Sequence, residues 1–161
     1  MKMKYLSILF ITIVLSCSAQ EKDFTKKIQK ISKNNKQNKV LHNGWYHISN
    51  QKNEFERVER KTGDKFYINP KPILIPENFK SHEEFENFEG DNGISVLFDS
   101  FGTKQWSKAT DLASGSHLIF ILNNKILSSS YVNSQITGGV SAFWKSEHTS
   151  REWDELNKIL K

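Results

Sequence analysis

Cysteine is almost absent from this sequence, because Cys17 is the only one among 161 residues. A single thiol cannot form an internal disulfide, so the fold must be stable without covalent cross-links. Long apolar runs are also scarce. After residue 16, no segment approaches the roughly 20 apolar residues that a membrane-spanning helix needs. We therefore expect the rest of the chain to form a soluble domain without spans of its own.

The sequence also lacks the motifs of common catalytic and metal sites. It contains no GxSxG nucleophile motif, no HExxH zinc motif and no phosphate-binding loop. None of its five histidines forms a short metal-spaced pair with another histidine or with the cysteine: His42, His47, His82, His117 and His148. We therefore predict that the protein is not an enzyme and that it holds no metal and no cofactor.

Three features that resemble sites have simpler structural interpretations. Asp99 follows a predicted strand and precedes a predicted helix, which is the position of a helix cap. His82 stands beside three glutamates, and such a cluster is typical of a solvated surface. Gly138-Gly139 can bring the backbone close to a ligand, but a tight turn between strands is the better explanation.

The N-terminus has the parts of an export signal. Lys2 and Lys4 are positively charged, residues 5–15 are apolar, and Cys17 follows directly after Ser16. This arrangement resembles the lipobox of bacterial lipoproteins, whose cysteine sulfur takes a diacylglycerol thioether before cleavage. We predict that residues 1–16 are a lipoprotein signal peptide and that Cys17 is lipidated. Ordinary cleavage among the small residues at 16–20 is the alternative.

Residue 18 bears on the location of the anchored protein. It is a serine rather than the aspartate associated with retention at the inner membrane. We therefore expect a lipid-anchored protein of the cell envelope, at the outer membrane, on either its periplasmic or its surface face.

Residues 17–42 are polar and rich in Lys, Asn and Gln. Without the two lysines of the signal peptide, 21 of the 23 basic residues remain against 18 acidic ones, and much of this mild excess lies here. Such a charge run is typical of a solvated linker, so we expect no nucleic-acid partner. Phe24, Ile28 and Ile31 recur at helical spacing, which allows a short helix. We predict a lipidated, flexible tether over 17–42.

Residues 43–161 are numerous enough for a single domain with its own core. The first part, 43–76, predicts a small antiparallel β-meander with strands at 44–48, 55–60 and 65–69. Pro70 and Pro72 should break its ladder, because proline has no N–H to donate, and residues 73–75 can pair briefly before Pro76. A capping-box pattern at 81–84 then predicts a short helix that runs to Glu89.

The second part, 77–161, has the clearer pattern. It predicts a strand at 94–98, a helix at 103–114, strands at 118–122, 125–130 and 140–144, and a helix at 151–160. Gly115 is placed to end the first helix, and Asn123-Asn124 predicts a tight turn. The order β-α-β-β-β-α predicts an α+β fold, namely a ferredoxin-like antiparallel sheet with two helices on one face.

Part of this region carries a family pattern. A strand ends at an aspartate, a helix follows, and then come an aliphatic strand, a short turn and a final Gly-Gly: Asp99, Gly102, Trp106, Thr110, 118–122, 123–125 and Gly138-Gly139. These residues resemble the head subdomain of the first periplasmic domain of SecD and SecDF, which assists Sec-dependent protein export. That family usually has proline where Ser130 stands.

The resemblance extends over residues 93–161 and implies the fold of a substrate-facing periplasmic module. It does not imply a translocation motor, because SecD works through transmembrane helices and proton coupling.

We therefore expect a non-catalytic module that binds protein or peptide in the envelope and is related to protein export. The candidate binding residues are Ser128, Ser130, Tyr131, Asn133, Gln135, Gly138, Gly139 and Trp144. Trp45 and Trp144 lie on predicted strands and can face either way. Core packing is the favoured interpretation, and an exposed aromatic face, the alternative, would suit polypeptide binding. One alternative is an envelope immunity or inhibitor protein against a cognate toxin. Another is an enzyme that uses Asp99 or His117.

The lipidation of Cys17 has a direct test. Labelling of cells with a palmitate analogue should mark the wild-type protein and should disappear in Cys17→Ser, because no other cysteine can take the thioether. Labelling that persists in Cys17→Ser would contradict the prediction.

Overall fold

The computed structural model describes residues 4–161, with side chains described from residue 21 onward. The first three residues of the predicted signal peptide 1–16, its side chains and that of Cys17 therefore lie outside the described part. The elements are α1 (Lys4–Asn38), β1 (Gly44–Ile48), β2 (Glu56–Val58), β3 (Lys65–Leu74), β4 (Phe79–Glu86), β5 (Asn92–Phe98), α2 (Ser100–Leu112), β6 (Ser116–Leu122), β7 (Lys125–Val132), β8 (Val140–Trp144) and α3 (Ser150–Leu160).

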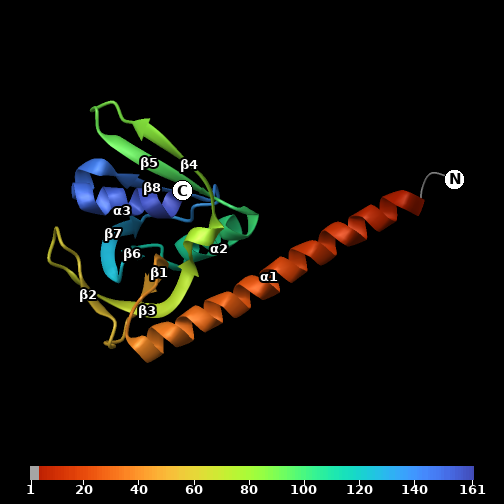
Figure 1. Ribbon diagram of the computed structural model, residues 1–161, viewed down its shortest axis with the longest axis horizontal. Coiled ribbons are helices and arrows are strands. Elements are labelled where there is room, and N and C mark those ends of the chain that lie inside the picture. The colour runs from red at the N-terminus through yellow and green to blue at the C-terminus, as the bar shows by residue number, and fades with distance from the viewer. Residues whose placement is uncertain (1–3) are drawn as a thin grey trace.

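The strands form two antiparallel sheets, and the predicted α+β class is confirmed. The larger sheet has the order β2-β3-β1-β6-β7, and the smaller one has the order β4-β5-β8 (Figure 1). The order of elements after Gly93 is also as predicted. The three strands of the N-terminal part are not joined in chain order, however, because β1 pairs with β3 and β6, while β2 pairs only with β3.

The main core lies where the two sheets and the helices α2 and α3 meet. Trp45 of β1 stands at its centre and is only 1% exposed. Its ring centroid lies 4.9 Å from that of Trp106 on α2, 5.2 Å from Phe120 on β6 and 5.8 Å from Phe143 on β8. Leu156 of α3 is fully buried in the same cluster. Trp45 is therefore a core residue.

The larger sheet curls, because β2 and β7 at its two edges contact each other. Arg57 on β2 stabilises this contact between the sheet edges, because its Nε donates to the carbonyl of Asn124, in the turn before β7, at 2.9 Å. A second apolar cluster fills the face that the curl encloses: Leu41, Tyr46, Phe55, Ile68, Ile119, Ile121 and Ile126.

Local signals at helix ends and turns are confirmed. The Asp99 side chain accepts from the Gly102 amide at the start of α2. Thr149 and Glu152 form the capping box of α3. Gly115 has φ +77°, and Asn123 and Asn124 have φ 50° and 65°, which suits the tight turn between β6 and β7.

The predicted helix at 81–89 is wrong, because this segment is the strand β4. β4 pairs with β5 from Phe79↔Phe98 to Glu86↔Asn92. The capping-box pattern is a local preference, and the ladder to β5 outweighs it. A further consequence is that Phe85 reaches across Gly93 to Trp144, which no helix at this position would allow.

The predicted break of the ladder at the prolines is wrong, because β3 runs from Lys65 to Leu74. The brief pairing predicted for 73–75 is confirmed at Leu74, which lies opposite Trp45. Pro72 lies opposite Tyr46, and the pairing of β1 with β3 shifts register on both sides of Tyr46. β2 pairs only as far as Tyr67, so this part of β3 has no β2 neighbour beyond that point. Proline is tolerated at irregular or edge positions of this kind.

The polar segment predicted as a flexible tether is helical up to Asn38. Its side toward the domain packs on β3 and α2: Ile28 is 4% exposed, and the rings of Phe24 and Phe101 lie 4.4 Å apart. Lys27 pairs with Glu77 at 2.8 Å. The N-terminal half of α1 projects away from the domain (Figure 1). The helical spacing of Phe24 and Ile28 was the signal for this contact, and burial against the sheet extends the helix beyond what local propensity predicts.

A buried amide holds the C-terminal end of α1. Asn35 is fully buried, and its Nδ2 donates to the carbonyl of Pro70 at 2.8 Å and to the Tyr46 hydroxyl at 3.3 Å. The His42 amide donates to Asn35 Oδ1 at 3.2 Å. Burial raises the pKa of Tyr46 well above its usual range, so this hydroxyl stays protonated and donates to the carbonyl of His42.

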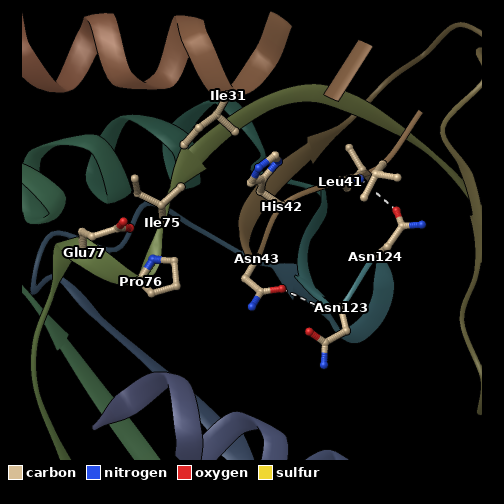
Figure 2. Close-up of a pocket in the computed structure, with 10 residues that line it drawn as sticks. Ile31, Leu41, His42, Asn43, Ile75, Pro76, Glu77, Asn123 and Asn124 are labelled. Carbon is tan, nitrogen blue, oxygen red and sulfur yellow. Dashed lines mark hydrogen bonds between the residues drawn. The ribbon is translucent and has the colours of Figure 1, made fainter. Parts of the chain in front are cut away.

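The connection from α1 to β1 is tied to the β6–β7 turn. The Leu41 amide donates to Asn124 Oδ1 and the Asn123 amide donates to Asn43 Oδ1, each at 2.8 Å (Figure 2). Ile31 of α1 and Ile75 lie beside this connection. Together with its residues they line an open groove of about 510 Å³.

Replacement of Asn35 should test whether α1 is an integral part of the domain. Asn35→Ala removes the partner of the part-buried Pro70 carbonyl and of the His42 amide and leaves a gap at a fully buried position, so the free energy of unfolding should fall by about 2 kcal/mol. Urea unfolding measures this change. The exposed neighbour Gln37→Ala should change it by less than about 0.5 kcal/mol. Equal effects of the two variants would show that α1 is not held by this amide.

Candidate functional site

The smaller sheet has one buried face and one face that no described element covers. Residues alternate between the two faces, so paired positions form three rows across β4, β5 and β8. We call this uncovered surface the outer face. Its rows are Ser81-Leu97-Val140, Glu83-Ser95-Ala142 and Phe85-Gly93-Trp144.

The burial of the opposite face determines which residues point outward. Ile94, Val96 and Phe143 belong to the main core and are at most 1% exposed. Their neighbours along the strands must therefore point away from the core. Val140 is 39% exposed, and Leu97 is partly exposed. The outer face thus offers apolar side chains to the solvent, which is the usual property of an interaction surface.

An aromatic pair marks one end of the outer face. The rings of Phe85 and Trp144 lie 4.8 Å apart in an edge-to-face arrangement. They meet above Gly93, where a Cβ atom would lie 2.5 Å from Phe85 Cζ and 3.0 Å from the carbonyl of Phe143. The absence of a side chain at Gly93 therefore allows the two rings to meet.

The border of the outer face along β4 and its hairpin is acidic. Phe88 at the hairpin tip is fully exposed, and the Asn87 side chain holds the tip by accepting from two backbone amides at 2.9 Å. The carboxylates of this border are Glu83 on the outer face and Glu89 and Asp91 in the hairpin turn, whereas Glu84 and Glu86 alternate to the opposite face of β4. The outer face therefore carries apolar side chains in its two end rows, a middle row that contains Glu83, and an acidic hairpin beside its Phe85 end.

The candidate residues on β7 do not form one surface with the outer face. Ser128 and Ser130 pair with Phe120 and Leu118 and lie on the side of the main core, where Ser128 is buried. Tyr131 points the other way, is 55% exposed and packs edge-to-face on His117 at 5.2 Å.

The loop after β7 is fastened to α2. Gln135 Nε2 donates to Ser107 Oγ at 3.0 Å, and the Ile136 amide donates to Thr110 Oγ1 at 2.8 Å. Asn133 is exposed, and its carbonyl accepts from Ser114 Oγ at 3.3 Å.

Gly138 and Gly139 lead from this loop into β8. Gly139 has φ +66° and lies directly against Thr103, so a side chain would be excluded there. Gly138 has open space around it. Of the eight candidate residues, Trp144 is the one that lies on the outer face.

Sequence reasoning missed Phe85, Leu97 and Val140 as surface residues. The run at 94–98 is apolar at four of five positions, which hides the outward Leu97. Phe85 was assigned to a helix, so its place beside Trp144 could not be predicted. Alternation along 140–144, with Phe143 inward, was the one available signal for the outer face.

Asp99 and His117, the residues considered for catalysis, both have structural roles. Asp99 caps α2, and the His117 ring lies between Phe66 and Tyr131. His148 beside the end of β8 is half-buried, and burial lowers its pKa, so it is neutral at neutral pH. Within the described part, no three His, Cys, Asp or Glu side chains are grouped as metal ligands. No described helix has the length and apolar character needed to cross a membrane.

Comparison with known proteins gives one family. The sequence model of the family described as SecDF, P1 head subdomain, matches residues 52–161. No curated protein matches the chain.

The solved structures that resemble the chain include two of SecDF. One is SecDF, a membrane component that enhances protein export, with 20% identity and a TM-score of 0.48 over 55% of this chain and 40% of that chain. The other is SecDF in a super-membrane-facing form, with 21% identity and a TM-score of 0.49 over 58% of this chain and 12% of that chain. The chain thus matches less than half the length of either.

The packing over Gly93 gives a prediction for the outer face. Gly93→Ala forces Phe85 away from Trp144, so the free energy of unfolding should fall by about 1–3 kcal/mol. Gly93→Ala should cost less free energy of unfolding when Phe85 is already replaced by alanine, as in Gly93→Ala/Phe85→Ala, because the obstructing ring is then absent. Gly138→Ala, which meets no neighbour, is the matched control and should be nearly neutral. Urea unfolding followed by tryptophan fluorescence measures all three. A neutral Gly93→Ala would contradict the described packing.

Proposed function

Because this chain belongs to the SecDF P1 head subdomain family, we propose that it is a membrane-anchored envelope protein whose outer face binds polypeptide segments in support of protein export, without catalysis. The anchor in this proposal is the lipid on Cys17, which follows from the signal-like N-terminus. Several acyl chains on one cysteine hold a protein firmly at a membrane.

The uncovered outer face is the observation that carries the proposal. Leu97, Val140 and Trp144 offer apolar contact area, and Phe85 supports the Trp144 ring. Aromatic side chains contribute much of the energy of polypeptide recognition, since they bury a large area with few rotatable bonds.

The acidic border suggests the chemistry of the segment that would bind. Glu83 lies within the outer face, and Glu89 and Asp91 lie in the hairpin turn beyond the Phe85 end of it. These charges favour a segment that carries lysine or arginine next to its apolar residues. Signal peptides have this composition, because a basic region precedes their apolar core.

A peptide-binding experiment tests the face and its preference. Fluorescent apolar peptides with flanking lysines should bind the full-length protein in mild detergent more tightly than the same peptides with flanking glutamates. Ala142 is exposed at the centre of the outer face, so Ala142→Arg should lower affinity for the lysine peptide at least about tenfold. Fluorescence anisotropy measures both effects.

A matched control separates the outer face from the β7–β8 loop. Ser134 is exposed on that loop and lies among the candidate residues. Ser134→Arg adds the same charge and should leave affinity unchanged. If Ser134→Arg abolishes binding and Ala142→Arg does not, the site is the loop and the proposed face is wrong. If neither peptide binds, the proposed activity itself is wrong.

A further inference from the structure

The two sides of α1 differ completely in chemistry. Successive residues of a helix are 100° apart, so Phe24, Ile28 and Asn35 share one side, which packs on the domain. The opposite side carries a row of lysines, and every one of them is exposed. We call this row the lysine face: Lys22, Lys26, Lys30, Lys33 and Lys36.

The lysine face is not neutralised by the protein. Within the described side chains, no carboxylate pairs with any of its five lysines, whereas Lys27 on the flank of the helix does pair with Glu77. Only two acidic residues, Glu21 and Asp23, occur between residues 21 and 38. The row therefore keeps its positive charge free for an external partner.

The charge of the molecule is also divided unevenly. Residues 21–38 contain six lysines and two acidic residues, whereas residues 39–161 contain 15 basic and 16 acidic residues. The positive excess is thus confined to the first 38 residues of the chain. The acidic β4–β5 hairpin lies on the other side of the domain from the C-terminal end of α1 (Figure 1).

We propose that the lysine face is a docking surface for anionic lipid headgroups. Docking lays α1 along the membrane, with the domain on the side of α1 that faces away from the bilayer. The membrane setting rests on the proposed function, but the lysine face itself does not depend on the lipid. An anionic bilayer matches it because lysines near such a surface each add to binding, and because a lipid anchor commonly works together with a basic patch.

Docking in this way would orient the domain. Phe24, the first of the described side chains whose ring contacts the domain, follows Cys17 by seven residues, or about 10 Å of helix. The domain is therefore held close to its attachment point. Contact through the lysine face would leave the acidic hairpin directed away from the negatively charged surface.

Vesicle flotation of the full-length chain tests the proposal. Wild-type protein is mixed with vesicles of phosphatidylcholine alone and with vesicles that also contain phosphatidylglycerol. Phosphatidylglycerol should raise the partition coefficient at least about tenfold, and added salt should reverse the increase. Replacement of all five lysines of the face by glutamine should remove most of this increase. Glutamine is a good helix former, so α1 should persist.

A matched variant removes the same charge elsewhere. Lys52, Lys80, Lys104, Lys125 and Lys145 are also exposed, and their replacement by glutamine should preserve the response to phosphatidylglycerol. Equal losses in the two variants, or no loss in either, would overturn the proposal. The apolar N-terminal segment contributes to the binding of both kinds of vesicle. The ratio of the two partition coefficients therefore reports the effect of the headgroup charge alone. Failure of lipidation or of peptide binding would not alter this ratio, so the separate proposals can fail separately.

Discussion

The packing of Trp45 against Trp106, Phe120 and Phe143 is the contact on which the rest of the structure depends. It joins the larger sheet, α2 and the smaller sheet in one place. A chain with one cysteine has no disulfide to do this, so apolar burial must hold the layers together. The contact also determines the surface. Because Phe143 points into the core, Ala142 and Trp144 on either side of it must point outward, and this alternation creates the outer face.

Burial against the domain also holds α1 in place. A polar, lysine-rich helix has little intrinsic reason to be ordered, and helices of this kind gain most of their stability from packing. Ile28 and the buried Asn35 provide that packing. Once this side of the helix is docked, the spacing of the sequence leaves the lysines on the opposite side. The cationic surface is therefore a consequence of the core contact as much as of the composition.

Sequence reasoning succeeded where local chemistry is decisive. The caps at Asp99 and Thr149 and the turn at Asn123-Asn124 depend on a few neighbouring residues, and all three form as predicted. It failed where distant partners compete with local preference. The capping-box pattern at Ser81 lost to the ladder with β5, and Pro72 was accommodated by irregular pairing with β1. For the site, sequence patterns selected Trp144 but could not supply Phe85, which lies 59 positions earlier in the chain.

The sequence by itself determined the α+β class and the order of elements after Gly93, because periodicity and capping act over short distances. The likeness to the SecDF head came from matching residues such as Asp99, Gly102 and Gly138-Gly139. Only the tertiary structure decided that the strands divide into two sheets, that α1 is docked on the domain, and that the smaller sheet keeps an uncovered face. These features depend on which surfaces become buried against one another. Burial is settled by contacts between segments far apart in the chain, and no local pattern contains that information.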